Sequence, residues 1–548
     1  MELERRRDLA GPSARPGDVS VIDGSIQSFP LTLDRILEHA AKWHSDVEVV
    51  TAGEGGINRR VSYALLRQRA KQVSRVLRDF GVVVGSRVAT LAWNSQAHVE
   101  VWYAIMGMGS VCHTLNPRLT ATQLAWMLGQ SDAKILIVSA DLLPLAMKVA
   151  ADASNLERIL VIDGDAAGQR LDAVELLALE PLLERATDDF EWGGFDECSP
   201  SGLCFTSGST GAPKGVTYTH RSSFLHTLRL LQADVLGVKS TDVVLPVVPM
   251  FHANAWGLPF AVPAAGSKLV LPGRHTDGAS LARLIAAEKV TIAVGVPTVW
   301  LGLCEHLETT GTHLPSLKRI IVGGAPMPPA LMERIEKQLG VPVQTSWGMT
   351  ELSPVGTFGV LSDSVRNAAV SGRPALGVDL MVADENGDPL KQQREQEGRL
   401  HVRGAAVIER YFGQDRSAIT ADGWFDTGDL ARIDGQGNLM ITGRAKDLIK
   451  SGGEWINPAE IEAVVCTLPQ VSLAAVIGRN DNKWGERPIL LVEIREDQNI
   501  SDQDLLASLR GRVASWWIPD AVVRVPSMPL ASTGKIDKIR LRATFGGG

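Results

Sequence analysis

The chain has 548 residues, of which 45% are hydrophobic and 21% charged, a composition typical of a globular enzyme. This length exceeds what a single hydrophobic core usually serves, so we expect three or four folding units. The formal net charge of -7 argues against a general basic field for nucleic acid or anionic lipid, and no apolar segment reaches the length of a membrane span.

The N-terminal segment, residues 1–30, is polar, and we expect it to form an arm over the surface. Its arginines at 5–7 are not followed by the apolar segment that a signal peptide needs. The five cysteines are widely spaced and form no Cys-x-x-Cys pair: Cys112, Cys198, Cys204, Cys304 and Cys466. This pattern is typical of unpaired thiols in a reducing compartment, so we expect a soluble, cytoplasmic protein.

Regular structure is predicted from about residue 33 onward. Apolar residues recur at helical spacing over 33–40 and 66–80, and the second of these helices has Ser62 as its N-cap and Gly81 as its stop. Short, apolar, β-branched segments predict strands at 87–93, 134–139, 158–163, 242–248, 268–271, 291–296 and 319–322. Helices that alternate with such strands predict α/β layers with largely parallel sheets.

The pattern changes near residue 370. Strands at 379–383, 398–403 and 438–442, separated by Gly/Asp turns, predict a small, antiparallel, β-barrel-like subdomain. A Gly-rich, charged segment at 443–446 then marks a boundary. Beyond it we expect a small α+β domain with strands at 473–477, 488–494 and 522–525 and helices at 458–468 and 502–516. The chain is therefore predicted to contain a large N-terminal domain over 31–445 and a mobile C-terminal domain over 446–548.

The strongest local signal for chemistry is the segment TSGSTGAPKG at residues 206–215, which follows a strand-like run. Backbone N–H groups and hydroxyls in such a loop can surround phosphate oxygens, and Lys214 adds positive charge. We expect phosphate contacts from Thr206, Ser207, Gly208, Ser209, Thr210, Gly211 and Lys214. The loop is not a Walker A motif, because Pro213 stands where that motif has glycine. Taken alone, the segment could also be a solvated surface loop.

Six further motifs occur in order: FHANAWG at 251–257, GGAP at 323–326, SWGMTE at 346–351, GWFDTGDL at 423–430, GRAKDLIK at 443–450 and LASTGK at 530–535. With the phosphate loop, they make the chain resemble the adenylate-forming superfamily of acyl-CoA synthetases, firefly-type luciferases and peptide-synthetase adenylation domains. The resemblance covers roughly residues 30–545. It implies an AMP-binding domain with a C-terminal lid. It also implies a reaction in which ATP activates a carboxylic acid as an acyl-adenylate before the acyl group passes to coenzyme A.

The resemblance also assigns nucleotide-binding roles. Asp429 would accept the ribose hydroxyls, Arg444 would reach ribose or phosphate, Thr350 would bond the α-phosphate, and Glu351 would hold Mg²⁺ between phosphates. The remaining contacts would come from Gly324, Ala325, Pro326, Ser346, Trp347, Gly348 and Met349. Trp347 replaces the commoner Tyr and offers a flat face to adenine. Without the other motifs, an exposed turn aspartate would explain Asp429 equally well, and a capping or salt-bridged glutamate is the alternative for Glu351.

Lys535 is the residue to which the resemblance gives the most direct catalytic role. Its ammonium would bridge the substrate carboxylate and the α-phosphate and so cancel the repulsion between them. A lysine in a polar tail would otherwise be a solvated side chain.

On the acid side, the resemblance implies that His252 contacts the carboxylate and that Trp256 gates the acyl channel. Both could instead be packed core residues. The rest of the wall is expected to be Val296, Thr298, Val322, Gly323 and Val355. This lining is mostly apolar, and no aspartate is placed to bind an α-amino group, so a hydrophobic acid is favoured over acetate or an amino acid.

For the second half-reaction, the resemblance implies that the C-terminal domain rotates about Lys446. The rotation would remove Lys535 and bring in a loop formed by Ser451, Gly452, Gly453 and Glu454, beside which coenzyme A would enter. The chain continues only to residue 548 after Lys535, with no carrier domain, so free CoA is the expected acceptor.

Three other functions are alternatives. A related adenylate-forming enzyme would pass the acyl group to a carrier protein or to oxygen. A P-loop phosphotransferase conflicts with Pro213. A silent nucleotide-binding scaffold conflicts with the intact set of Thr350, Glu351, Asp429, Arg444 and Lys535. Among ligases, the sequence resembles those that act on medium- and long-chain fatty acids and on methylthiopropionate. Aryl acids are an alternative substrate class. The sequence does not decide whether the protein is a homodimer.

Overall fold

The computed structural model describes residues 24–547 except 54–55, 57, 167–173, 207–212, 362–366, 453 and 532–534. The chain divides into two compact units, Met1–Pro30 and Leu31–Gly548. All described helices and strands lie in the second unit. None of the described helices is long and apolar enough to cross a lipid bilayer.

A seven-stranded sheet forms the first α/β layer, in the order β7-β6-β5-β3-β4-β8-β9. Neighbouring strands are parallel except β8 and β9. The strands are β3 (Arg87–Leu91), β4 (Val111–Thr114), β5 (Ile135–Ser139), β6 (Arg158–Ile162), β7 (Glu175–Ala178), β8 (Pro200–Phe205) and β9 (Gly215–Thr219). The largely parallel α/β layer expected from the sequence is therefore confirmed.

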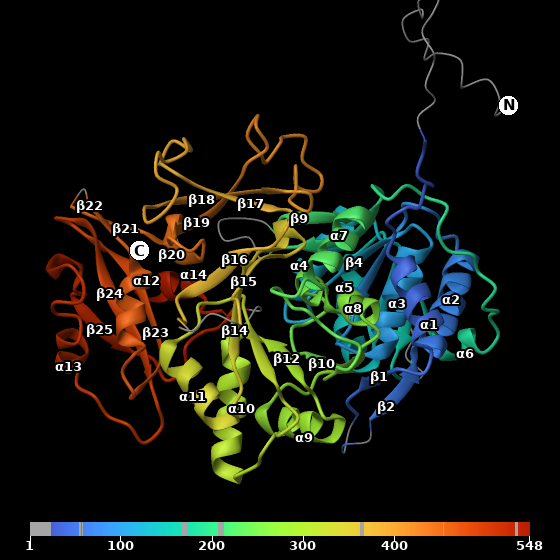
Figure 1. Ribbon diagram of the computed structural model, residues 1–548, viewed down its shortest axis with the longest axis horizontal. Helices are drawn as coiled ribbons and strands as arrows, with labels where there is room; N and C mark the ends of the chain where they lie inside the picture. The colour runs from blue at the N-terminus through green and yellow to red at the C-terminus, as the bar shows by residue number, and fades with distance from the viewer. Residues whose placement is uncertain are drawn as a thin grey trace, which may run out of the picture. The chain divides into compact units, whose positions relative to one another are not determined.

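Alternation along these strands places helices on both faces of this sheet. Ile135 and Ile137 face one core with α1 (Asp34–Trp43), α2 (Tyr63–Asp79) and α3 (Gln96–Gly107), which lie together in Figure 1. Leu136 and Val138 face the opposite core with α4 (Ala121–Ser131) and α5 (Leu143–Asp152). Because strand side chains point alternately to the two faces, an unbroken apolar run is what a strand buried on both faces requires.

The predicted boundaries of α2 agree with its local chemistry. The Ser62 hydroxyl accepts a hydrogen bond from the Leu65 backbone N–H, which satisfies one of the free donors of the first turn. At the other end, Gly81 has a φ of 87° and its N–H bonds the Arg78 carbonyl. Glycine reaches this left-handed conformation without steric cost, so it ends the helix.

The second sheet has thirteen described strands in the order β17-β18-β19-β20-β16-β15-β14-β13-β12-β10-β11-β1-β2. In the part of this sheet that runs from β14 through β13, β12, β10 and β11 to β1, all neighbouring strands are parallel. The strands of this part are β1 (Glu48–Thr51), β2 (Arg59–Ser62), β10 (Val243–Pro246), β11 (Lys268–Leu271), β12 (Ile292–Gly295), β13 (Arg319–Val322) and β14 (Val343–Gly348). Its helices are α7 (His220–Leu230), α8 (Leu258–Ala264), α9 (Gly278–Glu288), α10 (Pro297–Thr310) and α11 (Pro329–Leu339).

The antiparallel end of this sheet corrects one expectation. Its strands are β15 (Val355–Phe358), β16 (Val370–Pro374), β17 (Val378–Ala383), β18 (Glu397–Gly404), β19 (Phe425–Ile433) and β20 (Leu439–Arg444). The sequence predicted a separate barrel-like subdomain, but β16 pairs with β15 on one side and β20 on the other. The described strands therefore extend the large sheet and form no closed barrel.

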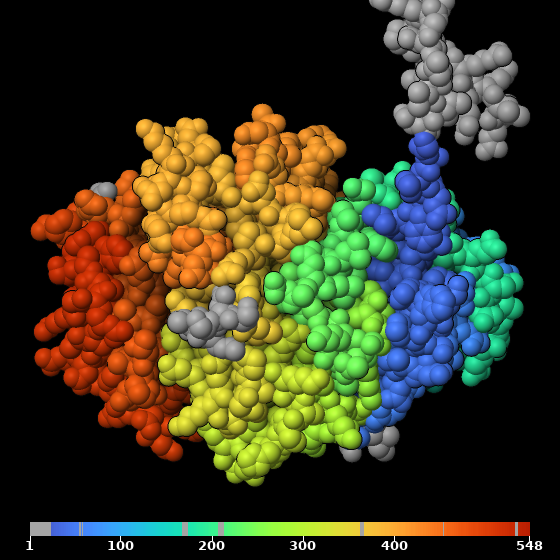
Figure 2. All heavy atoms as spheres, viewed as in Figure 1, coloured from blue at the N-terminus to red at the C-terminus, as the bar shows by residue number. Residues whose placement is uncertain are grey.

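The C-terminal segment has its own sheet and core, and Figure 2 shows it as the orange-to-red block at one end of the view. Its strands are β21 (Ile449–Ser451), β22 (Glu454–Ile456), β23 (Val471–Asp481), β24 (Gly485–Ile494) and β25 (Ala521–Arg524). Its helices are α12 (Pro458–Val465), α13 (Asp502–Ala507) and α14 (Lys538–Phe545).

The helix predicted over 502–516 is wrong in its second half, because α13 ends at Ala507. Gly511 then adopts a φ of 72°, which a continuous helix does not allow. Leu509 is nevertheless fully buried and Val513 packs against the same core, which explains the helical spacing in the sequence.

Candidate active site

The phosphate-loop motif joins the carboxyl end of β8 to β9. Thr206 and Lys214 close its base, since the Thr206 N–H donates to the Lys214 carbonyl at 2.9 Å. The other predicted loop residues, 207–211, lie outside the described residues. A Cβ on Gly215 would lie 2.8 Å from the Cβ of Phe412, so only glycine allows this close approach.

The GGAP motif follows β13, and the SWG motif forms the end of the neighbouring parallel strand β14, so their residues meet at one edge of the sheet. The Ser346 hydroxyl donates to the Val322 carbonyl at 3.1 Å. A Cβ on Gly348 would meet the Pro354 carbonyl oxygen at 2.3 Å, so glycine is required there too. Next along the chain, the Met349 N–H donates to the same Pro354 carbonyl. Ala325 is half-buried and Pro326 is exposed at this edge.

Thr350 and Glu351 begin a short 3-10 turn after β14. The Tyr218 hydroxyl donates to the Thr350 carbonyl at 3.0 Å. The Glu351 residue is only 7% exposed, and the Tyr411 hydroxyl donates to its Oε1 at 2.9 Å. Burial raises the pKa of Glu351, and the Tyr411 hydrogen bond acts in the opposite direction, followed by the charges of Arg444 and Lys214.

Asp429 on β19 is 2% exposed and is held from two sides. Arg444 Nε lies 2.7 Å from its Oδ1, and the Trp347 indole N–H donates to Oδ2 at 2.9 Å. Burial raises the pKa of Asp429, and Arg444 is the largest opposing influence. Trp347 was expected to offer a ring face to adenine, but its hydrogen bond to Asp429 was not foreseen. Tyrosine, the commoner residue at this position, has no side-chain N–H with which to make this bond.

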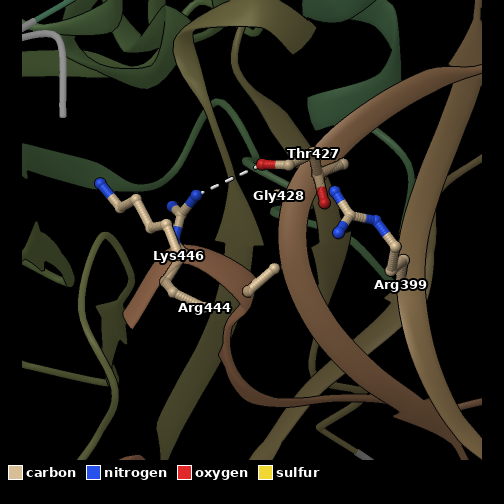
Figure 3. Close-up of a pocket in the computed structure, with 6 residues that line it drawn as sticks. Arg399, Thr427, Gly428, Arg444 and Lys446 are labelled. Atoms are coloured by element: carbon tan, nitrogen blue, oxygen red, sulfur yellow. Dashed lines mark hydrogen bonds between the residues drawn. The ribbon is translucent and has the colours of Figure 1, made fainter. Parts of the chain in front are cut away.

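A cavity of about 370 Å³ opens beside these groups (Figure 3). It is lined by Arg399, Thr427, Gly428, Arg444, Ala445 and Lys446. In Figure 3 the Arg444 guanidinium points toward Thr427, whose carbonyl it reaches at 3.3 Å, while the Lys446 side chain extends away. Arg399 approaches from β18 and is paired with Asp426 at 2.5 Å. Arg399 was not predicted from the sequence, because nothing in the strand pattern distinguishes it from a solvated arginine.

Lys535 is bound through its main chain, since the Ala531 N–H donates to the Lys535 carbonyl at 2.6 Å. The pKa of its ammonium is lowered to about 8, first by loss of hydration and then by the charge of Arg444, while Asp429 and Glu351 oppose the shift. The residue itself is exposed. The charges that act on its pKa, those of Arg444, Asp429 and Glu351, belong to the predicted nucleotide side.

His252 links this group to the acid side. It is half-buried, and its pKa is lowered to about 4 by burial first and then by the charges of Lys535 and Arg118. The imidazole is therefore neutral near pH 7, and it can donate or accept one hydrogen bond without carrying charge.

The acid side is formed largely by packing around Trp256, which is 8% exposed. A Cβ on Gly323 would lie 2.9 Å from its Cη2, and one on Gly324 would lie 3.5 Å from its Cζ2. The same Cβ on Gly324 would also meet Val296 at 3.4 Å. The indole thus lies against the two glycines: a Cβ on Gly323 would be too close to it, whereas a Cβ on Gly324 would be in ordinary contact.

Val355 shares the core cluster of Trp256, and Val296 packs against that cluster. Val322 does not, since it packs in a different core with residues of α10 and α11. Thr298 is half-buried in the first turn of α10. Val322 is therefore a core residue, and alternation along β13 gives the reason, because it places neighbouring side chains on opposite faces.

The backbone that carries Trp256 is unusual. Ala253, Asn254, Ala255 and Trp256 have φ values of 44°, 54°, 46° and 54°, and Gly257 follows at 77°. Left-handed conformation costs a non-glycine residue about 1–2 kcal/mol, so the surrounding packing must hold this turn in place.

The residues predicted to form the hinge and the CoA-facing loop lie in the C-terminal segment. Lys446 is the central residue of a 3-10 turn, Ala445–Asp447, between β20 and β21. The Ser451 hydroxyl accepts from Arg487 at 3.3 Å, and the Gly452 N–H donates to the Trp484 carbonyl at 2.7 Å. Glu454 is exposed, and Gly453 lies outside the described residues.

Comparison with known proteins identifies the family. The profile described as AMP-binding enzyme matches residues 37–412, and that of the AMP-binding enzyme C-terminal domain matches residues 460–535. A 3-methylmercaptopropionyl-CoA ligase of Ruegeria lacuscaerulensis is 38% identical over 95% of this chain and 98% of its own. A medium-chain-fatty-acid–CoA ligase of Ectopseudomonas oleovorans is 39% identical over 95% and 97%, and a long-chain-fatty-acid–CoA ligase of Thermus thermophilus is 39% identical over 94% and 96%.

Solved structures agree with this result. ATP-bound MatB from Rhodopseudomonas palustris is 26% identical, with a TM-score of 0.82 over 94% of this chain and 99% of that one. The apo form of the same protein gives a TM-score of 0.73 over the same shares of both chains. The chain therefore belongs to the AMP-binding enzyme family, and it is an ATP-dependent acid–thiol ligase that acts through an acyl-adenylate.

Proposed function

We propose that this ligase activates a hydrophobic carboxylic acid, of medium or long chain or with a thioether or aryl group, and transfers it to free coenzyme A. The observation that carries the proposal is the acid-side wall, where Trp256 lies against Gly323 and Gly324 beside Val296. None of these wall residues carries a charge, and the neighbouring His252 is neutral. An apolar wall gains free energy from burying apolar substrate surface, whereas an amino or second carboxylate group would lose hydration there.

On the nucleotide side, Asp429 is proposed to accept the ribose hydroxyls, with Arg444 beside it and Thr350 at the α-phosphate. Asp429 is buried and fixed by two partners, which supports an anchoring role. The cavity next to Arg444 provides space for the nucleotide. Lys214 and Thr206, at the base of the phosphate loop, are proposed to meet the outer phosphates.

Glu351 is proposed to hold Mg²⁺ together with phosphate oxygens. One of its carboxylate oxygens accepts a hydrogen bond from Tyr411. Within the described parts of the chain, no group of three or more His, Cys, Asp or Glu side chains could hold a metal ion by itself. This fits Mg²⁺, which is commonly bound by one or two carboxylates plus substrate phosphates. When bound, the ion would neutralise phosphate charge.

Lys535 is proposed to bring the acid carboxylate and the α-phosphate together. Its position among Asp429, Glu351, Arg444 and His252 supports this role. The higher TM-score with ATP-bound than with apo MatB supports an adenylating arrangement. For the second step, rotation about Lys446 would withdraw Lys535 and admit coenzyme A along the loop that includes Gly452.

A panel of acids tests the proposal. Straight-chain acids of graded length, 3-methylthiopropionate, aryl acids, malonate and an amino acid are each incubated with ATP, Mg²⁺ and CoA, and AMP release is measured. We expect the highest kcat/KM among the uncharged apolar acids, with acyl-CoA formed in equal amount to AMP. A preference for malonate or an amino acid would contradict the apolar wall. AMP release without thioester would favour a carrier protein as acceptor.

A further inference from the structure

We propose that Tyr411 is a positioning residue that holds Glu351 and Lys214 in a fixed relation to each other for the adenylation step. Tyr411 lies in the segment between β18 and β19 and belongs to none of the motifs identified from the sequence. The inference rests on the proposed roles of Glu351 and Lys214 toward Mg²⁺ and phosphate, and it adds the element that connects them.

The hydroxyl of Tyr411 aims one carboxylate oxygen. It donates to Glu351 Oε1 at 2.9 Å, within a site where Glu351 is almost fully buried. A tyrosine phenol is ordinarily protonated near pH 7 and can donate one hydrogen bond. A hydrogen bond to a charged acceptor is directional, so it fixes which way the second oxygen, Oε2, points.

The ring of Tyr411 meets the lysine. Lys214 Nζ lies 4.7 Å from the centre of the Tyr411 ring, a distance at which a cation is attracted to the face of an aromatic ring. Lys214 is exposed and has a long flexible side chain. Contact with a half-buried ring therefore reduces the number of positions that its ammonium can take.

The backbone around Tyr411 connects the same two motifs. Ile408 N–H donates to the Glu351 carbonyl at 3.0 Å, and Phe412 N–H donates to the Gly215 carbonyl at 2.8 Å. Phe412 also packs directly on Gly215, where no Cβ fits. Residues 408–412 therefore connect the 3-10 turn of Glu351 to the base of the phosphate loop through both main chain and side chain.

The side-chain interactions of Tyr411 among the described residues are with Glu351 and Lys214. We therefore assign it a role exerted through these two residues. Such a role predicts a selective defect. Loss of the hydroxyl should disturb the Mg²⁺-dependent part of ATP binding and the adenylation step, but not the transfer of an adenylate that is already made.

The test compares Tyr411→Phe with Tyr103→Phe. The first variant keeps the ring under Lys214 and removes only the hydroxyl. The control removes a buried hydroxyl that donates to the Pro259 carbonyl at 2.9 Å. ATP affinity is measured by calorimetry with Mg²⁺ and with EDTA. We expect Tyr411→Phe to lose most of the increase in affinity that Mg²⁺ gives, with metal-free ATP binding changed less than about twofold, and Tyr103→Phe to keep that increase.

Both half-reactions are then assayed separately. In Tyr411→Phe, acid-dependent pyrophosphate exchange should fall about 10- to 100-fold, as expected for one hydrogen bond to a charged group. Thioester formation from supplied acyl-adenylate should stay within about twofold. In a Glu351→Gln background, Tyr411→Phe should add little further loss, because the two residues act together.

Equal loss in both half-reactions, or losses that add fully in the double variant, would overturn the positioning role. Unchanged Mg²⁺-dependent ATP affinity would overturn it as well. Failure of the proposed function has a different signature, because the unmodified protein would then show no acid-dependent exchange at all.

Discussion

The two sides of the active site are held by different forces. On the nucleotide side, Asp429 is fixed by Arg444 and Trp347, and Glu351 is fixed by Tyr411, through hydrogen bonds and an ion pair of 2.7–2.9 Å. On the acid side, Trp256 is held by close packing on two glycines and by a left-handed turn. Directional bonds demand particular residue types at particular positions, whereas packing tolerates many combinations of apolar residues. Sequence motifs therefore identify the residues of the nucleotide side, whereas the choice of acid is expected to depend on the shape of the apolar wall.

The largest effect is expected on the nucleotide side. Lys535→Ala should reduce acid-dependent pyrophosphate exchange by about 10²–10³, because one preorganised charge is lost where negative groups meet. Thioester formation from supplied acyl-adenylate should remain largely intact. Equal loss in both half-reactions would show that Lys535 supports the fold, with no specific part in adenylation.

A second large effect is expected at the hinge. Lys446→Pro fixes φ near −65° and removes an N–H, so it should slow thioester formation by about 100-fold or more while adenylate still accumulates. Proline also disfavours the helical backbone of the preceding Ala445, so the melting temperature of the variant is measured. The matched control is Lys446→Ala, which changes the side chain but leaves φ free and should form thioester at a near-normal rate. Normal acyl-CoA production by the folded proline variant would place the pivot elsewhere.

The pH dependence should separate the two half-reactions. Lys535 is charged below its lowered pKa of about 8 and loses its proton above it. Adenylation should therefore fall as the pH rises through about 8, approaching tenfold per unit beyond it. Lys535→Arg should move this limb to higher pH, because arginine stays protonated. A limb at the same pH in the arginine variant would assign it to another group.

The smallest effect is expected on the acid side. Trp256→Ala opens the space over Gly323 and Gly324, so kcat/KM should shift toward longer or bulkier acids by about 10-fold. The KM for ATP should change less than about twofold. Trp43→Ala, at an exposed site on α1, is the control and should leave the acid panel unchanged. An unchanged panel for Trp256→Ala would make this indole a core residue.

Much of the architecture follows from sequence periodicity. Apolar runs predicted the parallel strands, and Ser62 predicted the start of α2, because both signals are local. The joining of the antiparallel strands to the large sheet was not predictable from their spacing, since it depends on β16 pairing with β15 as well as β20. The helix predicted after Asp502 was too long for a similar reason. The buried Leu509 keeps the helical spacing of apolar residues although the backbone has already left the helix.

In the site, too, local patterns predicted some residues, while residues positioned by contacts between distant segments were missed. Motifs identified Asp429, Arg444, Glu351, Lys535 and His252, and the structure brings their charges within mutual influence. Tyr411 and Arg399 were missed, because each reaches the site through a contact between distant segments and neither stands in a distinctive local pattern. Val322, predicted for the acid wall, packs in the core beside α10 and α11 and not in the cluster of Trp256. One feature of the sequence that could have drawn attention to Tyr411 is the rarity of tyrosine, since the chain has only 4 tyrosines.

Acid-dependent exchange of radiolabelled pyrophosphate into ATP, measured without CoA, tests the two-step account most directly. Lys535, Asp429 and Glu351 already lie together in this structure, so the first half-reaction should run on its own with Mg²⁺ and a hydrophobic acid. Exchange should be abolished when the acid is omitted and should fall sharply in Lys535→Ala. Exchange that appears only when CoA is present would contradict a free acyl-adenylate and with it the central claim.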